Sequence, residues 1–270
     1  MFYERIQKLA QSLVHYSTKV QPGDLVFIHG KGFDTRDLAE AVMAEAVKAG
    51  GVPYLYYEDD RALRRLLLEG DEKTFQKLGE FLLLEMKQAN VYIGIRGSDN
   101  VFELSDVPKE KLQLYDKYIV GPVHIEQRVK HTRWCVLRYP NPAMCQLAKQ
   151  SSESFQKFYY DVCCLDYARM DAAAQPLKEL MNRTSRVRIT APETDIEFSI
   201  QDIPAAPCSG EMNIPDGECF TAPVRDSVNG VIRFNASSVH EGVLYDYVEL
   251  TFKDGKAVEM DSGKNSESLR

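Results

Sequence analysis

Predicted strands and helices alternate over the first hundred residues, and this alternation limits the chain to a small set of folds. The apolar run Leu25–Ile28 follows a Pro-Gly turn and is typical of a buried strand. A helix is predicted over residues 35–51, with Thr35 as its N-cap and two glycines at its end. Two helical stretches (60–68 and 72–89) and two strands (52–59 and 91–97) complete the pattern. Such βαβ units form a mostly parallel sheet flanked by helices.

The second half of the chain has a different pattern. Residues 151–182 are predicted to be helical, and short β-branched or alternating segments separated by turns follow Arg183. A hairpin is predicted over Phe252–Val258, with its turn at residues 253–256. We therefore expect an α/β chain whose later part is β-rich, mixed α+β and dominated by antiparallel pairing.

Two prolines, Pro140 and Pro142, interrupt the chain between these patterns. We predict an N-terminal α/β domain at residues 1–145 and a second, β-rich domain at residues 146–270. No covering helix follows the last predicted strands, so one apolar face of the second sheet would be wet. We expect either that a partner subunit covers this face or that the domain is incomplete.

Composition argues against several classes of protein. The net charge of −7 gives no concentrated positive surface for nucleic acid or an anionic membrane, so neither is expected as a partner. No apolar run approaches the roughly 20 residues that span a bilayer. The first helix is amphipathic, unlike the apolar core of a signal peptide, which predicts a cytoplasmic protein. Six cysteines without a C-x-x-C pair give neither a zinc ribbon nor a disulfide framework.

One segment, residues 210–230, combines turn formers with a carboxylate and reads GEMNIPDGECFTAPVRDSVNG. Pro215, Asp216 and Gly217 predict a turn, which is followed by Glu218 and a β-prone run. Such a turn fixes one carboxylate against a strand edge. From the residues alone, the simpler interpretation is that Glu218 accepts hydrogen bonds at the turn.

Residues 213–223, NIPDGECFTAP, resemble the segment N-[IL]-P-x-G-E-x-F-T-A-P of the aminopeptidase T family, thermophilic metal-dependent aminopeptidases also called aminopeptidase S. The resemblance is tight from Gly210 to Val231 and loose over the first half of the chain. It implies a homodimer that releases N-terminal amino acids from peptides through a water activated by two metal ions. It also places one metal ligand on Glu218.

The resemblance further implies two divalent ions per active site. Zinc, cobalt, manganese or magnesium could serve, because mixed oxygen and nitrogen ligands discriminate poorly among them. The other ligands of the family, a second Glu, two His, an Asp and a Tyr, lie in later motifs that have no match here. Residues 146–270 are therefore expected to be the first part of the metal-binding catalytic domain. No catalytic residue and no organic cofactor is assigned.

Other candidate residues have simpler interpretations. Glu211 could support a metal ligand, but a solvated charge at a strand edge is the simpler assignment. His240 lies beside Glu241, yet adjacent residues of a strand point to opposite faces, which weakens a joint role. Residues 29–32, HGKG, follow a strand where a phosphate-binding loop would lie, but they lack the third glycine and the GK[ST] pattern, which favours a plain turn.

These observations lead to one hypothesis and two alternatives. The hypothesis is a cytoplasmic, homodimeric metalloaminopeptidase that acts on peptides. The first alternative is a non-catalytic or truncated relative that serves binding or assembly. The second is a nucleotide- or sugar-phosphate-binding α/β protein, which depends on the loop after the first strand.

Overall fold

The computed structural model describes residues 2–240 and 243–269, whose contacts define two compact units. The first unit comprises Met1–Ala168 and Gly210–Asp216, and the second comprises Arg169–Ser209 and Gly217–Arg270. No helix in the described residues is long and apolar enough to cross a membrane. The domain boundary that the prolines indicate, between residues 145 and 146, stays a prediction.

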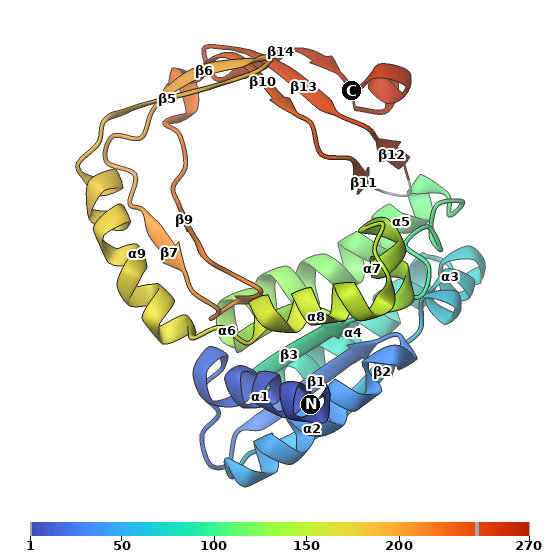
Figure 1. Ribbon diagram of the computed structural model, residues 1–270. Helices are drawn as coiled ribbons and strands as arrows, with labels where there is room; N and C mark the ends of the chain where they lie inside the picture. The colour runs from blue at the N-terminus through green and yellow to red at the C-terminus, as the bar shows by residue number, and fades with distance from the viewer. Residues whose placement is uncertain (1, 241–242, 270) are drawn as a thin grey trace. The chain divides into compact units, whose positions relative to one another are not determined.

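The first unit is built on a five-stranded sheet with the order β2-β1-β3-β4-β8, in which every pair is parallel (Figure 1). The predicted parallel sheet is thus confirmed. The repeated switch from apolar runs to amphipathic helices produces it, because parallel neighbours need a crossover connection. Its strands are β1 (Leu25–Lys31), β2 (Val52–Glu58), β3 (Val91–Arg96), β4 (Arg133–Arg138) and β8 (Asn213–Ile214).

Helices cover both faces of this sheet, as a parallel sheet requires. On one face, Phe27 and its register neighbour Tyr92 join a buried cluster with Phe75 of α4 and Ile119 of η3. On the other face Val26, Ile28 and Ile93 are fully buried, and α2 contacts β1 and β2. The helices of this unit are α1 (Phe2–Gln11), α2 (Arg36–Lys48), α3 (Asp60–Glu69), α4 (Glu72–Gln88), α5 (Lys109–Tyr115), α6 (Val129–His131), α7 (Pro142–Leu147) and α8 (Ser152–Cys163), with the widened, π-type helices η1 (Ser12–Ser17) and η3 (Asp116–Arg128) and the 3₁₀ turn η2 (Phe33–Thr35).

Side chains at the helix ends show why these helices begin where they do. The carboxylate of Asp59 accepts from the Ala62 N–H at the start of α3, and Asp71 forms a capping box with Thr74 at the start of α4. Thr35 is the N-cap residue of α2, as predicted, but its side chain makes no capping hydrogen bond. Its hydroxyl instead donates to the Gly32 carbonyl at 2.6 Å, because the 3₁₀ turn η2 directly precedes α2.

The second unit contains an antiparallel sheet with the order β14-β13-β10-β6-β5, which confirms the expected β-rich region. The predicted hairpin is formed by β13 and β14, and Asp254 and Gly255 take positive φ at its turn. The strands of this sheet are β5 (Arg186–Ala191), β6 (Thr194–Ser199), β10 (Asn229–Phe234), β13 (Val248–Lys253) and β14 (Lys256–Asp261). Two short ribbons, β7 (Ala206–Cys208) with β9 (Glu218–Phe220) and β11 (Ser238–His240) with β12 (Val243–Tyr245), and the 3₁₀ turns η4 (Arg225–Ser227) and η5 (Gly263–Leu269) complete it.

The helical region predicted over residues 151–182 consists of two helices. α8 ends at Cys163, and α9 begins at Tyr167 and runs to Asn182, so most of α9 belongs to the second unit. Two apolar stripes, one ending at Leu165 and the other beginning at Leu177, correspond to these two helices.

A substitution at Gly32 tests how tightly the loops after β1 and β3 approach each other. Gly32 has φ +84°, and a Cβ there would lie 2.1 Å from the carbonyl oxygen of Gly97. Gly23 has a similar φ of +86°, but a Cβ there would meet nothing within 4 Å. We expect Gly23→Ala to cost about 1–2 kcal/mol of unfolding free energy from the backbone alone. Gly32→Ala should cost at least about 1 kcal/mol more because the loops must separate.

Urea unfolding followed by tryptophan fluorescence measures both variants, since the single tryptophan, Trp134, lies in β4 of the same unit. Equal losses at the two glycines would contradict the close approach of the loops.

Candidate functional site

Residues 210–216, the first part of the motif segment, pack into the first unit. Within them, β8 extends the parallel sheet, and Ile214, which pairs with Leu137 of β4, is only 2% exposed. The Val136 N–H donates to the Met212 carbonyl at 2.9 Å. The segment is therefore held by a strand ladder before it reaches its turn.

The turn after β8 is stabilised by Asp216. Its carboxylate accepts from the Gly210 N–H at 2.9 Å, and the Ser17 hydroxyl donates to the Gly210 carbonyl. The hydrogen-bond acceptor that the sequence suggested at this turn is thus supplied by Asp216 and not by Glu218.

Glu218 is the first residue of β9 and lies opposite Cys208 of β7. Its side chain is exposed, and no hydrogen bond or ion pair involves it within residues 2–240 and 243–269. A carboxylate fixed on a strand and free of partners has both oxygens available to a cation. The geometry is compatible with a metal ligand.

One carboxylate does not make a metal centre. Across the described part of the chain, no group of three or more His, Cys, Asp or Glu residues could hold an ion. Stable divalent sites use three or four protein ligands or a pair of bridging carboxylates. These residues alone therefore do not fit a metal cluster, and no step of a metal-assisted reaction follows from them.

The other sequence candidates are exposed residues with surroundings of their own. Glu211 is exposed and lies 3.8 Å from the Lys19 ammonium, which agrees with a solvated charge. His240 is exposed at the end of β11, opposite Val243. Its neighbour Glu241 lies outside the described residues.

The histidines of the first half include two that lie together in a polar layer on the sheet. His29 Nδ1 is 2.8 Å from the Tyr92 hydroxyl, and the ring of His124 stacks with that of His29 at 6.5 Å. Burial, followed by the charges of Lys31, Arg96 and Arg128, lowers the pKa of His29 to about 3. Burial and the neighbouring His29 lower the pKa of His124 to about 4. Both imidazoles are therefore neutral at pH 7.

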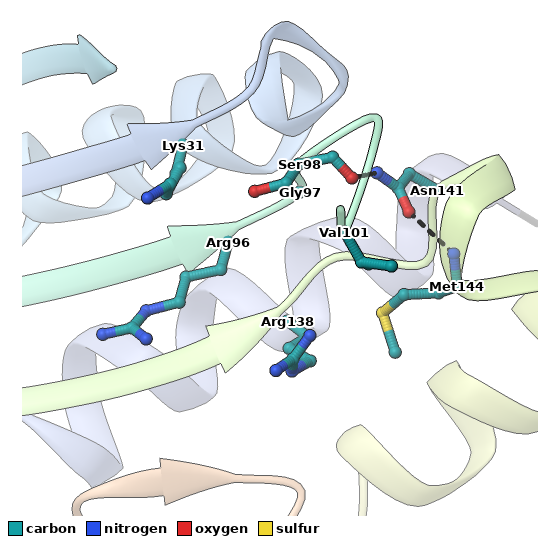
Figure 2. Close-up of a pocket in the computed structure, with 8 residues that line it drawn as sticks. All are labelled: Lys31, Arg96, Gly97, Ser98, Val101, Arg138, Asn141 and Met144. Atoms are coloured by element: carbon teal, nitrogen blue, oxygen red, sulfur yellow. Dashed lines mark hydrogen bonds between the residues drawn. The ribbon is translucent and has the colours of Figure 1, made fainter. Parts of the chain in front are cut away.

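The carboxyl edge of the parallel sheet carries basic residues whose grouping the sequence did not reveal. Lys31, Arg96 and Arg138 are the last residues of β1, β3 and β4, and the strand register places them side by side. They line a small cavity with Ser98 and Asn141, which lie on the loops that follow β3 and β4 (Figure 2). The sequence signal is a basic residue at the end of three of the apolar runs, and only the strand register shows that these three residues are neighbours.

Lys31 is already paired within this group. Its ammonium lies 3.1 Å from a Glu58 carboxylate oxygen and 2.9 Å from an Asp60 oxygen. Burial acts to lower the pKa of Lys31, but these two carboxylates outweigh it and raise the pKa. The predicted plain turn after β1 is present at Gly32, and Lys31 itself belongs to the strand.

Comparison with known families gives a match over nearly the whole chain. The model of the thermophilic metalloprotease (M29) family matches residues 2–270. Aminopeptidase 2 of Geobacillus stearothermophilus is 21% identical, over 99% of this chain and 72% of its own length. Aminopeptidase T of Thermus thermophilus is 23% identical, over 100% of this chain and 73% of its own length.

Solved structures show the same fold. Wild-type AmpT from Thermus thermophilus superimposes with a TM-score of 0.83 at 20% identity, over 100% of this chain and 74% of AmpT. A 2,5-dihydroxypyridine dioxygenase from Pseudomonas putida reaches a TM-score of 0.54 at 12% identity, over 99% of this chain and 71% of the dioxygenase. At these identities the likeness concerns the fold alone.

The neutral histidines predict acid sensitivity between pH 6.5 and 5. The unfolded chain binds protons at these imidazoles near pH 6.5, whereas the folded chain binds them only near pH 3–4. Lowering the pH through this window therefore favours the unfolded state, by about 1.4 kcal/mol per pH unit for each histidine. We expect the unfolding free energy of the parent to fall by about 2 kcal/mol more than that of His124→Gln between pH 7 and pH 5.

Urea titrations at both pH values, followed by Trp134 fluorescence, measure this difference. The matched control is His131→Gln, because His131 is exposed at the end of α6. Parallel pH dependence in the parent and His124→Gln proteins would contradict the burial of a neutral imidazole.

Proposed function

Because the chain belongs to the thermophilic metalloprotease (M29) family, we propose that it is an aminopeptidase that releases N-terminal amino acids from peptides. The observation that carries this proposal is the match of the family model to residues 2–270, across both compact units. Two relatives that align along essentially the whole chain are named aminopeptidases, which supports the same reaction.

The proposal includes two divalent ions, with zinc, cobalt, manganese or magnesium as candidates and Glu218 as one ligand. Such ions, if bound, would supply a water of lowered pKa and would polarise the peptide carbonyl. What this chain contributes is placement. The ladder between β7 and β9 fixes the Glu218 backbone, and the exposed carboxylate has no competing partner among the described residues. The family resemblance also supports a homodimer, and we place the protein in the cytoplasm.

The alternative of a non-catalytic relative rests on one observation. In the described ranges, no group of three or more His, Cys, Asp or Glu residues could hold an ion. Metal content and hydrolysis, measured on the same preparation, separate the two functions.

The test compares the parent protein with Glu218→Gln, which keeps the size of the side chain and removes its charge. After dialysis against Zn²⁺ or Co²⁺, we expect the parent to contain bound metal, measured by plasma mass spectrometry. We also expect it to hydrolyse leucine p-nitroanilide. Glu218→Gln should contain less bound metal, and its kcat/KM should fall by about tenfold to a hundredfold. The matched control is Glu211→Gln, a second exposed carboxylate of the same segment, which should retain both properties.

Two results would contradict the proposal in different ways. A parent chain that binds no metal and is inert with every ion would support the non-catalytic alternative. If the parent is active and Glu218→Gln keeps its full metal content, the peptidase proposal stands, but Glu218 is not a metal ligand.

A further inference from the structure

The carboxyl edge of the parallel sheet has the topology of a ligand site. The chain leaves β1 for β2 on one side and then returns past β1 to form β3 on the other side. In open α/β sheets, ligands bind outside the carboxyl ends of the strands at such a switch point. The cavity bounded by Lys31, Arg96 and Arg138 lies at this position (Figure 2).

Two positive charges at this edge are uncompensated. Lys31 is neutralised by Glu58 and Asp60. Arg96 and Arg138 are exposed and register neighbours, and neither has an ion-pair or side-chain hydrogen-bond partner in the described part of the chain. Like charges placed directly opposite each other on adjacent strands are destabilising unless an opposite charge joins them. The pair therefore favours an anion between or beside the two guanidinium groups.

The cavity itself suits a small anionic group. Its volume is about 160 Å³, which is enough for a carboxylate or phosphate group and too small for a nucleotide. Asn141 is 2% exposed and fixed, because its amide donates to the Ser98 carbonyl at 2.8 Å and its oxygen accepts from the Met144 N–H at 3.1 Å. A guanidinium presents a planar fork of donors that matches two oxygens of a carboxylate or phosphate.

A larger, mostly apolar cavity of about 460 Å³ shares Arg96, Arg138 and Met144 with the small one. Its apolar wall is formed by α8 and by β8 with the proline that follows it, and includes Phe155, Phe158, Val162, Ile214 and Pro215. The two arginines therefore stand at the boundary between a polar pocket and an apolar groove. This combination selects a ligand that is anionic at one end and apolar at the other.

We propose that Arg96 and Arg138 bind the carboxylate or phosphate group of a small organic anion, whose apolar part lies in the groove along α8. The site is formed entirely by the first unit, so it does not depend on the peptidase activity or on Glu218. The proposed ligand is a small anion that carries a single ring or a short aliphatic side chain.

Isothermal titration calorimetry on the full chain tests this site with probes that separate charge from shape. N-acetyl-phenylalanine provides a carboxylate with an apolar body, and its blocked amine prevents hydrolysis by an aminopeptidase. Its primary amide has the same shape without the charge, and phenyl phosphate exchanges the carboxylate for a phosphate. We expect the amide to bind at least about tenfold more weakly than the acid, and the tighter of the two anions identifies the preferred group.

Variants localise the binding. Arg96→Gln and Arg138→Gln should each weaken anion binding by about tenfold to a hundredfold. Arg65→Gln, which removes the same charge from an exposed position of α3, and Glu218→Gln should both bind as the parent does. The proposal would be overturned if the acid and its amide bound equally well or if neither anion bound. It would also be overturned if the two arginine variants bound the anion as tightly as the parent does.

Discussion

The parallel register of β1, β3 and β4 is the constraint on which the first unit depends. Because these strands pair residue for residue in one direction, their last residues end at one edge of the sheet. The same register aligns Phe27 with Tyr92 on one face, where α4 and η3 cover them. A slip by one residue would turn these side chains to the opposite face and separate the basic residues. Packing and the charged edge therefore have a single origin.

The layer between the sheet and η3 shows how this packing tolerates polar groups. Arg128 is only 7% exposed, and its guanidinium lies 5.1 Å from the Tyr92 ring and 4.5 Å from the Trp134 ring. Its Nε and Nη1 have no hydrogen-bond partner among the described atoms, so the two aromatic rings supply much of its stabilisation. Burial is the main reason that His29 and His124 stay neutral, and Arg128 adds to it, since charging either imidazole would place like charges together in a medium of low dielectric.

The sequence predicted those features that depend on local pattern. Strands β1, β2 and β3, the glycine stop after α2 and the hairpin at Asp254 and Gly255 follow from apolar periodicity and turn chemistry. The two-residue strand β8 is too short to have a period, and only pairing with β4 defines it. Helix η3 contains Pro122, which lacks an N–H, so a widened helix there depends on tertiary packing. The pairing of Arg96 with Arg138 is likewise a property of register and not of spacing.

The candidate metal site was likewise predicted from the sequence only in part. The motif from Asn213 to Pro223 identified Glu218 as an exposed carboxylate beside a turn, and the structure shows that Asp216 leaves it free of the turn's hydrogen bonds. No local pattern could show which residues would join it, because metal ligands are brought together by the fold from distant positions.

The fold alone does not choose the chemistry of this chain. An aminopeptidase and a dioxygenase both superimpose on it, with TM-scores of 0.83 and 0.54. One architecture can support unrelated reactions, since the reaction is determined by the few side chains that the fold presents. What separates the two here is the extent of the family match, which runs through both units and includes the segment around Glu218. The peptidase assignment therefore rests on the sequence family, and the architecture by itself does not supply it.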